Sequence, residues 1–326
     1  MVWSSVPVIS RLAFGILLLL VYTAAGAQAL NEAFLRSTVL ITFQSGPNTS
    51  SGTGFFLFRP TSGDRGQVLL VTNKQVLPPV GVEKDIQIRV VTGTADKAAV
   101  RFVDVPIVSK DGKYLPTVFL HPNTGFDVAA VNVTETIIKQ DVQGSWLPLD
   151  LLSTPDRLKS EGITVGDEIF LLGYPSAIFD ARNVSPILRE GVIATVPNEG
   201  YAFNDFLRSH FGLPDRIDGF LIDANVFPGS SGSVVILKQQ ATTIGPGGGT
   251  VVSAAKKIPY VLGIVSASIP ITDTALGSTQ RMGLGAAVGG NISTHADTAL
   301  SHGLSSAPPL VDRMPTCLAQ LHNSLH

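Results

Sequence analysis

The chain has 326 residues, 44% of them hydrophobic and only 15% charged, and it contains 32 glycines and 21 prolines. This composition favours a loop-rich β protein over a helical bundle, and the length is sufficient for two packed units with cores of their own. A formal net charge of −2, without a cluster of lysines and arginines, argues against a nucleic-acid partner.

The N-terminus has the pattern of an export signal. Arg11 precedes the uncharged apolar run 12–21, and Ala27-Gln28-Ala29 offers a small-x-small cleavage site, so residues 1–29 are predicted to be a cleaved signal peptide. An uncleaved membrane anchor is the alternative, although the apolar run is shorter than the roughly 20 residues that span a bilayer. No later segment has a transmembrane pattern, and we expect membrane contact only through the export signal.

Cysteine and histidine usage narrows the setting. Cys317 is the only cysteine, so no intrachain disulfide is possible. For an exported protein this favours a secreted or periplasmic bacterial protein over a disulfide-stapled animal domain, and the four Asn-x-Ser/Thr sequons are treated as chance. The six histidines show no ligand spacing, so no metal or other cofactor is predicted. The sequence gives no indication of the oligomeric state.

In chain order, short apolar runs alternate with turn residues at the spacing of an all-β sandwich or barrel. The run 86–90 also alternates with period two, which predicts one buried face. The predicted strands of the first half are 39–43, 54–58, 68–72, 86–90 and 127–131. Prolines and charged residues replace this pattern at 147–165, where a short helix is expected around 156–159.

Strands resume at 168–175 and 188–196. The glycine-rich stretch 245–249 is interpreted as a flexible hairpin tip. It is not a phosphate loop, because it lacks the Gly-Lys-Ser/Thr ending. The tail carries little pattern and is expected to be poorly ordered. The predicted organisation is a signal peptide at 1–29, a first β unit at 30–146, a connection at 147–165, a second β unit at 166–300 and a tail at 301–326.

The stretch 227–235 carries the strongest chemical signal. Gly229 and Gly232 bracket Ser230 and Ser231, and an apolar β-branched run follows at once. A nucleophilic serine needs a tight turn that lifts its hydroxyl clear of the backbone, with N–H groups nearby to hold an oxyanion, and glycine permits that turn. An ordinary polar turn that enters a strand is the competing interpretation.

Two earlier segments complete a pattern with this loop. Gly52-Thr53-Gly54-Phe55-Phe56 leads into a strand that ends at Thr72-Asn73-Lys74-Gln75-Val76, and His121-Pro122 is followed by Asp127-Val128-Ala129. Together with the serine loop they resemble the trypsin-like serine peptidases of the chymotrypsin fold, especially their disulfide-free bacterial branch. Further similar segments are 165–175, 186–193 and 260–266. The resemblance runs from about residue 39 to about residue 288.

This resemblance implies an all-β fold of two six-stranded antiparallel barrels with the cleft between them. It implies that Ser231 is the nucleophile, that Asp127 orients the base, and that the backbone N–H groups of Gly229 and Ser231 form the oxyanion hole. Asn225 matches the base of the primary specificity pocket, and Ser266 lies on the strand that lines this pocket. Because an amide does not favour basic side chains, small or apolar side chains are expected there.

Position 75 departs from the family pattern, which has histidine there. Glutamine has no proton-accepting lone pair near neutral pH, so Gln75 cannot take the proton of Ser231, although it could bridge Asp127 and Ser231 by hydrogen bonds. Loss of a triad member leaves only about 10³–10⁴-fold acceleration over water. His121 is the candidate for a replacement base. Alternatively, Gln75 is a substitution introduced to trap an inactive form.

Three functions follow. The first is a non-catalytic homologue that keeps the cleft and binds a polypeptide. The second is a serine endopeptidase that still works through His121 or a water relay. The third is a structural or adhesive envelope domain in which the cleft is a relic.

Overall fold

The computed structural model describes residues 30–62, 65–92, 99–123, 126–142, 144–180, 182, 185–227, 229–239, 242–244, 250–252, 258–275 and 278–289. The predicted signal peptide, the hairpin tip 245–249 and the tail 301–326 lie outside these ranges. All elements from Glu32 onward belong to one compact unit. No helix in the described ranges is long and apolar enough to cross a membrane.

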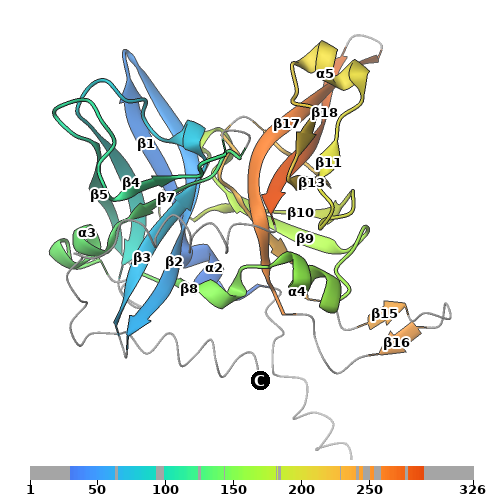
Figure 1. Ribbon diagram of the computed structural model, residues 1–326, viewed down its shortest axis with the longest axis horizontal. Helices are drawn as coiled ribbons and strands as arrows, with labels where there is room; N and C mark the ends of the chain where they lie inside the picture. Colours follow the sequence, from blue (N-terminus) through green and yellow to red (C-terminus); the bar gives the residue numbers. More distant parts are fainter. Residues whose placement is uncertain are drawn as a thin grey trace, which may run out of the picture. The chain divides into compact units, whose positions relative to one another are not determined.

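The first half of the chain forms a curled sheet, coloured blue to green in Figure 1. Its strand order is β5-β4-β1-β2-β3-β7-β6, all antiparallel, and β8 pairs with β2 in parallel. Beyond β5 the chain returns against the same strand, since Leu115 N donates to Ile107 O (2.9 Å). The strands are β1 (Thr38–Ser45), β2 (Asn48–Ser62), β3 (Arg65–Thr72), β4 (Lys84–Thr92), β5 (Ala99–Val108), β6 (Val118–Leu120), β7 (Ala129–Asn132) and β8 (Leu147–Pro148).

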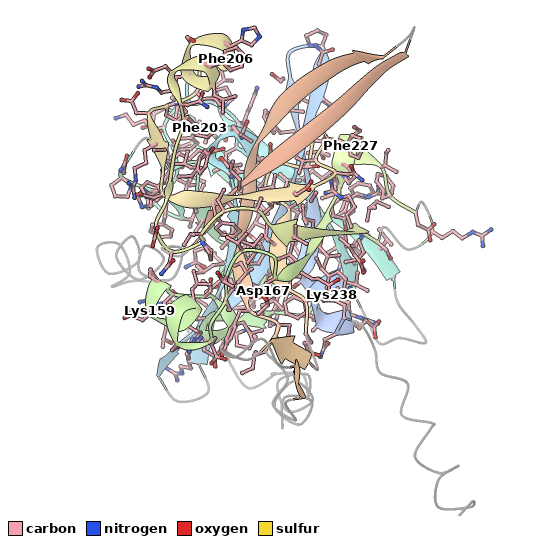
Figure 2. The ribbon with its side chains drawn as sticks, turned by 90° about the vertical axis from the view of Figure 1, so that its right-hand side faces the viewer. Lys159, Asp167, Phe203, Phe206, Phe227 and Lys238 are labelled. Carbon is pink, nitrogen blue, oxygen red and sulfur yellow. The ribbon has the colours of Figure 1, made fainter. Side chains whose placement is uncertain are left out.

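The second half forms a closed barrel with the strand order β10-β13-β18-β17-β14-β9. On its outer surface Lys238, labelled in Figure 2, pairs with Glu168 (3.3 Å) and Glu190 (3.5 Å). The strands are β9 (Glu168–Gly173), β10 (Ile187–Ile193), β13 (Gly219–Ala224), β14 (Val234–Leu237), β17 (Val261–Ala275) and β18 (Ser278–Gly289). The all-β fold of two curled antiparallel sheets is confirmed. The first sheet differs from the expected six strands: the described ranges hold eight, seven along the main path and β8 paired with β2.

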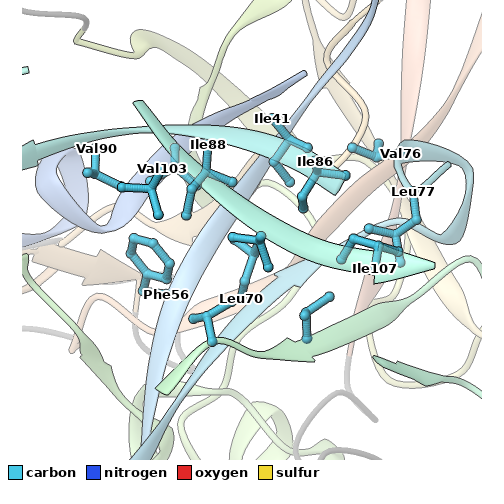
Figure 3. Close-up of a cluster of buried hydrophobic side chains, with 14 of the residues drawn as sticks. Ile41, Phe56, Leu70, Val76, Leu77, Ile86, Ile88, Val90, Val103 and Ile107 are labelled. Carbon is cyan, nitrogen blue, oxygen red and sulfur yellow. The ribbon is translucent and has the colours of Figure 1, made fainter. Parts of the chain in front are cut away.

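Alternating apolar residues build the core of the first sheet. Ile86, Ile88 and Val90 of β4 are buried while the residues between them are not, so the predicted period of two is confirmed. They share one cluster with Phe56 of β2 and Leu70 of β3, as Figure 3 shows. A separate cluster that includes Ile169, Leu171, Ile222, Val235 and Leu262 fills the barrel.

Short elements connect the strands. The helix expected near 156–159 is confirmed as α4 (Pro155–Ser160), which begins where the Thr154 hydroxyl accepts from Arg157 N (3.2 Å). The other short helices are α2 (Glu32–Ser37), α3 (Thr134–Lys139), α5 (Asp205–Phe211), and the 3-10 turns η1 (Lys74–Val76), η3 (Leu149–Leu151) and η4 (Pro175–Ala177). Two small pairs remain: β11 (Tyr201–Ala202) with β12 (Arg216–Ile217), and β15 (Thr242–Ile244) with β16 (Thr250–Val252).

Thr53, fully buried on β2, links the sheet to the barrel. Its N–H donates to Ser231 O (2.9 Å), and its hydroxyl accepts from Tyr174 N (2.9 Å). Thr53 O in turn accepts from the Thr72 hydroxyl (2.7 Å). One buried residue therefore bonds to the strand that leads to Gln75 and to the loop that carries Ser231.

Candidate active site

Gln75 follows the end of β3 and Asp127 precedes the start of the paired strand β7, so the two residues lie side by side. Gln75 lies in the turn η1, and this turn begins directly after the buried Asn73. The Asn73 side chain donates to Asp127 O (2.5 Å). Gln75 N donates to Asp127 Oδ1 (3.2 Å). These bonds fix the Gln75 backbone against the start of β7, so the turn and the carboxylate hold a single mutual orientation.

The Gln75 side chain uses both of its N–H groups. Nε2 donates to Asp127 Oδ2 (2.6 Å) and to the Ser266 carbonyl on β17 (2.8 Å). The Ser266 hydroxyl also donates to Asp127 Oδ2 (3.3 Å). Among the described residues the Gln75 side chain bonds to Asp127 and Ser266 and makes no hydrogen bond to Ser231, so only the Asp127 side of the possible bridge is formed.

The serine loop is a tight turn held on both sides. Gly229 (φ +82°) and Gly232 (φ +81°) take left-handed backbone angles that favour glycine. A Cβ on Gly232 would lie 1.9 Å from Thr53 O, so no side chain fits there. The bonds from Gly232 N to Val265 O and from Ser233 N to Ser230 O (both 2.9 Å) close the turn. Ser231 is half-buried within this closed turn.

Two N–H groups of this loop are available for a ligand. Within the described ranges, neither Gly229 N nor Ser231 N donates a hydrogen bond. Ser230 N, between them, donates to Phe227 O (3.0 Å). Paired unengaged N–H groups beside a serine hydroxyl are the arrangement that binds an oxyanion or a carbonyl oxygen.

Asn225 and Ser266, the two residues assigned to the specificity pocket, bond to different partners. Ser266 bonds with Asp127 and Gln75, whereas Asn225, which is exposed, has its carbonyl bonded by Arg189 Nη1 (2.6 Å). The same nitrogen donates to the hydroxyl of the buried Ser230 (3.1 Å). Sequence reasoning missed Arg189. It lies within the predicted strand 188–196, for which no buried face was predicted.

A family model described as the trypsin-like peptidase domain matches residues 52–245, more than half of the chain. This chain belongs to the trypsin-like peptidase family. A comparison with curated protein sequences gives no significant match.

Solved structures similar to this peptidase domain are distant in sequence. An inactive form of the M. tuberculosis protease Rv3671c is 19% identical with a TM-score of 0.38, and the match covers 84% of this chain and 91% of that one. An inactivated protease paralogue of the scabies mite is 14% identical with a TM-score of 0.43, covering 85% and 99%. The tobacco etch virus protease bound to product is 11% identical with a TM-score of 0.41, covering 86% and 82%.

His121 of the peptidase domain lies on the loop that leads to Asp127. It is buried, its Nδ1 bonds with Asn123, and its ring lies 4.3 Å from the ring of Phe126 at a tilt of 33°. Through these contacts the imidazole packs against residues of its own loop.

Lys74 directly precedes Gln75 in the sequence and carries a positive charge. Its ammonium donates to Asn123 O (3.0 Å). Burial lowers the pKa of Lys74, and the charge of Asp127 raises it in partial compensation. Among the described residues, no group of three or more His, Cys, Asp or Glu side chains is arranged to hold a metal ion.

Proposed function

We propose that this chain is a non-catalytic trypsin-like peptidase homologue that binds a polypeptide segment in its cleft. One observation carries the proposal: the Gln75 amide donates to Asp127 Oδ2 and to Ser266 O, at the position that the resemblance assigns to the catalytic histidine. An amide nitrogen in this role gives hydrogen bonds and takes no proton at neutral pH. Ser231 therefore stays a neutral alcohol.

The retained parts of the site support ligand binding. The N–H groups of Gly229 and Ser231 are unengaged within the described ranges, and the turn around them requires glycine at 232. A polypeptide carbonyl placed against these donors would be bound without being attacked. The family resemblance makes a polypeptide the class of ligand.

Fluorophosphonate labelling tests the catalytic part of the proposal. The wild-type chain should label slowly at Ser231, and Gln75→His should label and cleave peptides faster by about 10²–10⁴-fold, the range of general-base catalysis. The double variant Gln75→His/Ser231→Ala is the control that must not label. Labelling of the wild type at the rate of Gln75→His would overturn the proposal.

Binding tests the second part. Labelled peptide libraries should bind the wild-type chain, and Ser231→Trp, which fills the space above the half-buried loop, should abolish that binding. Equal binding by both proteins would place the ligand elsewhere. Absence of binding by the wild type would favour a structural domain with a relic cleft.

We also propose that the chain is exported by a bacterium, with residues 1–29 removed. The support is the apolar run after Arg11 and the small-x-small site that ends at Ala29. N-terminal sequencing of the protein from the periplasm or medium should give a start near Leu30, and an intact Met1 in those fractions would contradict cleavage.

A further inference from the structure

Arg189 lies on β10 with its side chain on the inner side of the barrel. It pairs with Leu171 of the barrel core across β9, and Ile193, four residues on, is fully buried. Its neighbour Glu190 takes the opposite face, where it pairs with Lys238 on the outer surface (3.5 Å). Because side chains alternate along a strand, Arg189 projects inward beneath the serine loop.

The guanidinium is under-satisfied in this place. Nη1 donates to Asn225 O and to the Ser230 hydroxyl, while Nε and Nη2 are buried and have no hydrogen-bond partner within the described ranges. A buried donor without a partner is costly, so buried arginines are ordinarily met by a carboxylate or by several carbonyls.

Neighbouring carboxylates do not neutralise the charge. Among the described residues Arg189 has no ion pair, since Glu190 faces Lys238 and Asp223 lies on the exposed face of β13. Burial lowers the pKa of Arg189, yet arginine stays protonated under ordinary conditions. A positive charge thus remains directly behind Asn225 and next to the residue that precedes Ser231.

We propose that Arg189 determines the specificity of this site and makes it select an acidic side chain of the bound polypeptide. The inference rests on the proposed function, since it names the ligand class of the same cleft. It replaces the expectation of small or apolar side chains, which considered the neutral amide of Asn225 alone. The guanidinium, bonded to the Asn225 backbone carbonyl, supplies the field that attracts a carboxylate, and no carboxylate among the described residues pairs with it.

Arg189 also has a structural role, because its two bonds hold Asn225 and Ser230. A purely structural role predicts that its removal weakens binding of every peptide alike. A specificity role predicts that removal changes the ratio between acidic and neutral peptides. The ratio is therefore the decisive measurement.

The test uses acetylated and amidated peptide libraries, so that terminal charges are absent, in which one central position is fixed as Glu, Gln, Leu or Lys. Fluorescence anisotropy on the full mature chain should give about tenfold tighter binding of the Glu library than of the isosteric Gln library. Arg189→Met should bring this ratio close to one, and Arg189→Lys should keep most of it. Arg101→Met, which removes an exposed charge on β5, is the control that keeps the full ratio.

Each outcome decides. A Glu-to-Gln ratio near one in the wild type, with measurable binding of both libraries, overturns the role of Arg189 and leaves polypeptide binding intact. A ratio that persists in Arg189→Met assigns the preference to another residue. If no library binds, the proposed function itself fails. As an independent readout, Gln75→His should cleave after acidic residues if it gains activity, and cleavage after apolar residues would contradict the inference.

Discussion

Asp127 accepts hydrogen bonds from three groups: the Gln75 backbone, the Gln75 side chain and the Ser266 hydroxyl. These bonds surround its negative charge with neutral dipoles. That charge also acts on the neighbouring Lys74, whose pKa burial lowers and Asp127 raises in partial compensation. Any second negative charge at position 75 would lie within hydrogen-bond distance of the carboxylate. At the scale of single residues, this makes position 75 sensitive to charge.

Gln75→Glu should therefore destabilise the fold in a pH-dependent way. Repulsion from Asp127 raises the pKa of the introduced carboxyl above its unfolded value of about 4.3. The penalty is absent while that carboxyl is protonated and grows as the pH rises through this range, to about 1 kcal/mol near neutrality for an exposed site. Urea unfolding at pH 4.5 and pH 7.5 checks this, with Gln75→Leu as the uncharged control. The same loss at both pH values would contradict it.

Gly232 is the second residue on which the site depends. Gly232→Ala must resolve a contact of 1.9 Å with Thr53 O at φ +81°, so a loss of about 3 kcal/mol or more is expected. Gly46→Ala is the matched control, because Gly46 also has a positive φ (+61°) but nothing within 4 Å of its Cβ. Its expected cost is about 1 kcal/mol. Equal losses in urea unfolding would show that the contact relaxes without cost.

At the scale of elements, β4 carries much of the first core with its alternating isoleucines. Ile88→Ala removes a fully buried side chain from the cluster of Figure 3 and should cost about 2–5 kcal/mol. Val82→Ala, at a position 68% exposed, should change stability by less than about 0.5 kcal/mol. Chemical denaturation of both variants gives the comparison, and a small effect at Ile88 would mean that the curled sheet collapses into the cavity.

The strands could largely be predicted because their signal is local. The alternation at 86–90 and the apolar runs of β3 and β14 are each visible within a few consecutive residues. The site partners could not be found in this way. Gln75 meets a carbonyl 191 residues away, and Arg189 meets Asn225 and Ser230 at separations of 36 and 41 residues. The closed barrel brings Arg189 to its partners, and the contact between the first sheet and the barrel brings Gln75 to Ser266. The motifs pointed to Asp127 and Ser231, but they carried no information about the Arg189 guanidinium that bonds next to Ser231.

At the scale of the whole molecule, Thr53 joins the two sheets. Thr53→Val keeps the shape but leaves the buried Tyr174 N–H without its acceptor, which should cost about 1–3 kcal/mol. The serine loop should also loosen, so peptide affinity should fall together with stability. Thr53→Ser keeps the hydroxyl and should retain both properties. Urea unfolding and anisotropy on the same samples check this, and unchanged affinity in Thr53→Val would show that the loop is held without Thr53.

The hydrogen bonds around Gln75 also bear on the history of this chain. A glutamine codon becomes a histidine codon by one nucleotide change at its third position, and the carboxylate that would receive the new imidazole is already oriented by Ser266 and by the turn at residue 75. If Gln75→His restores hydrolysis, the enzyme lies a single mutational step away.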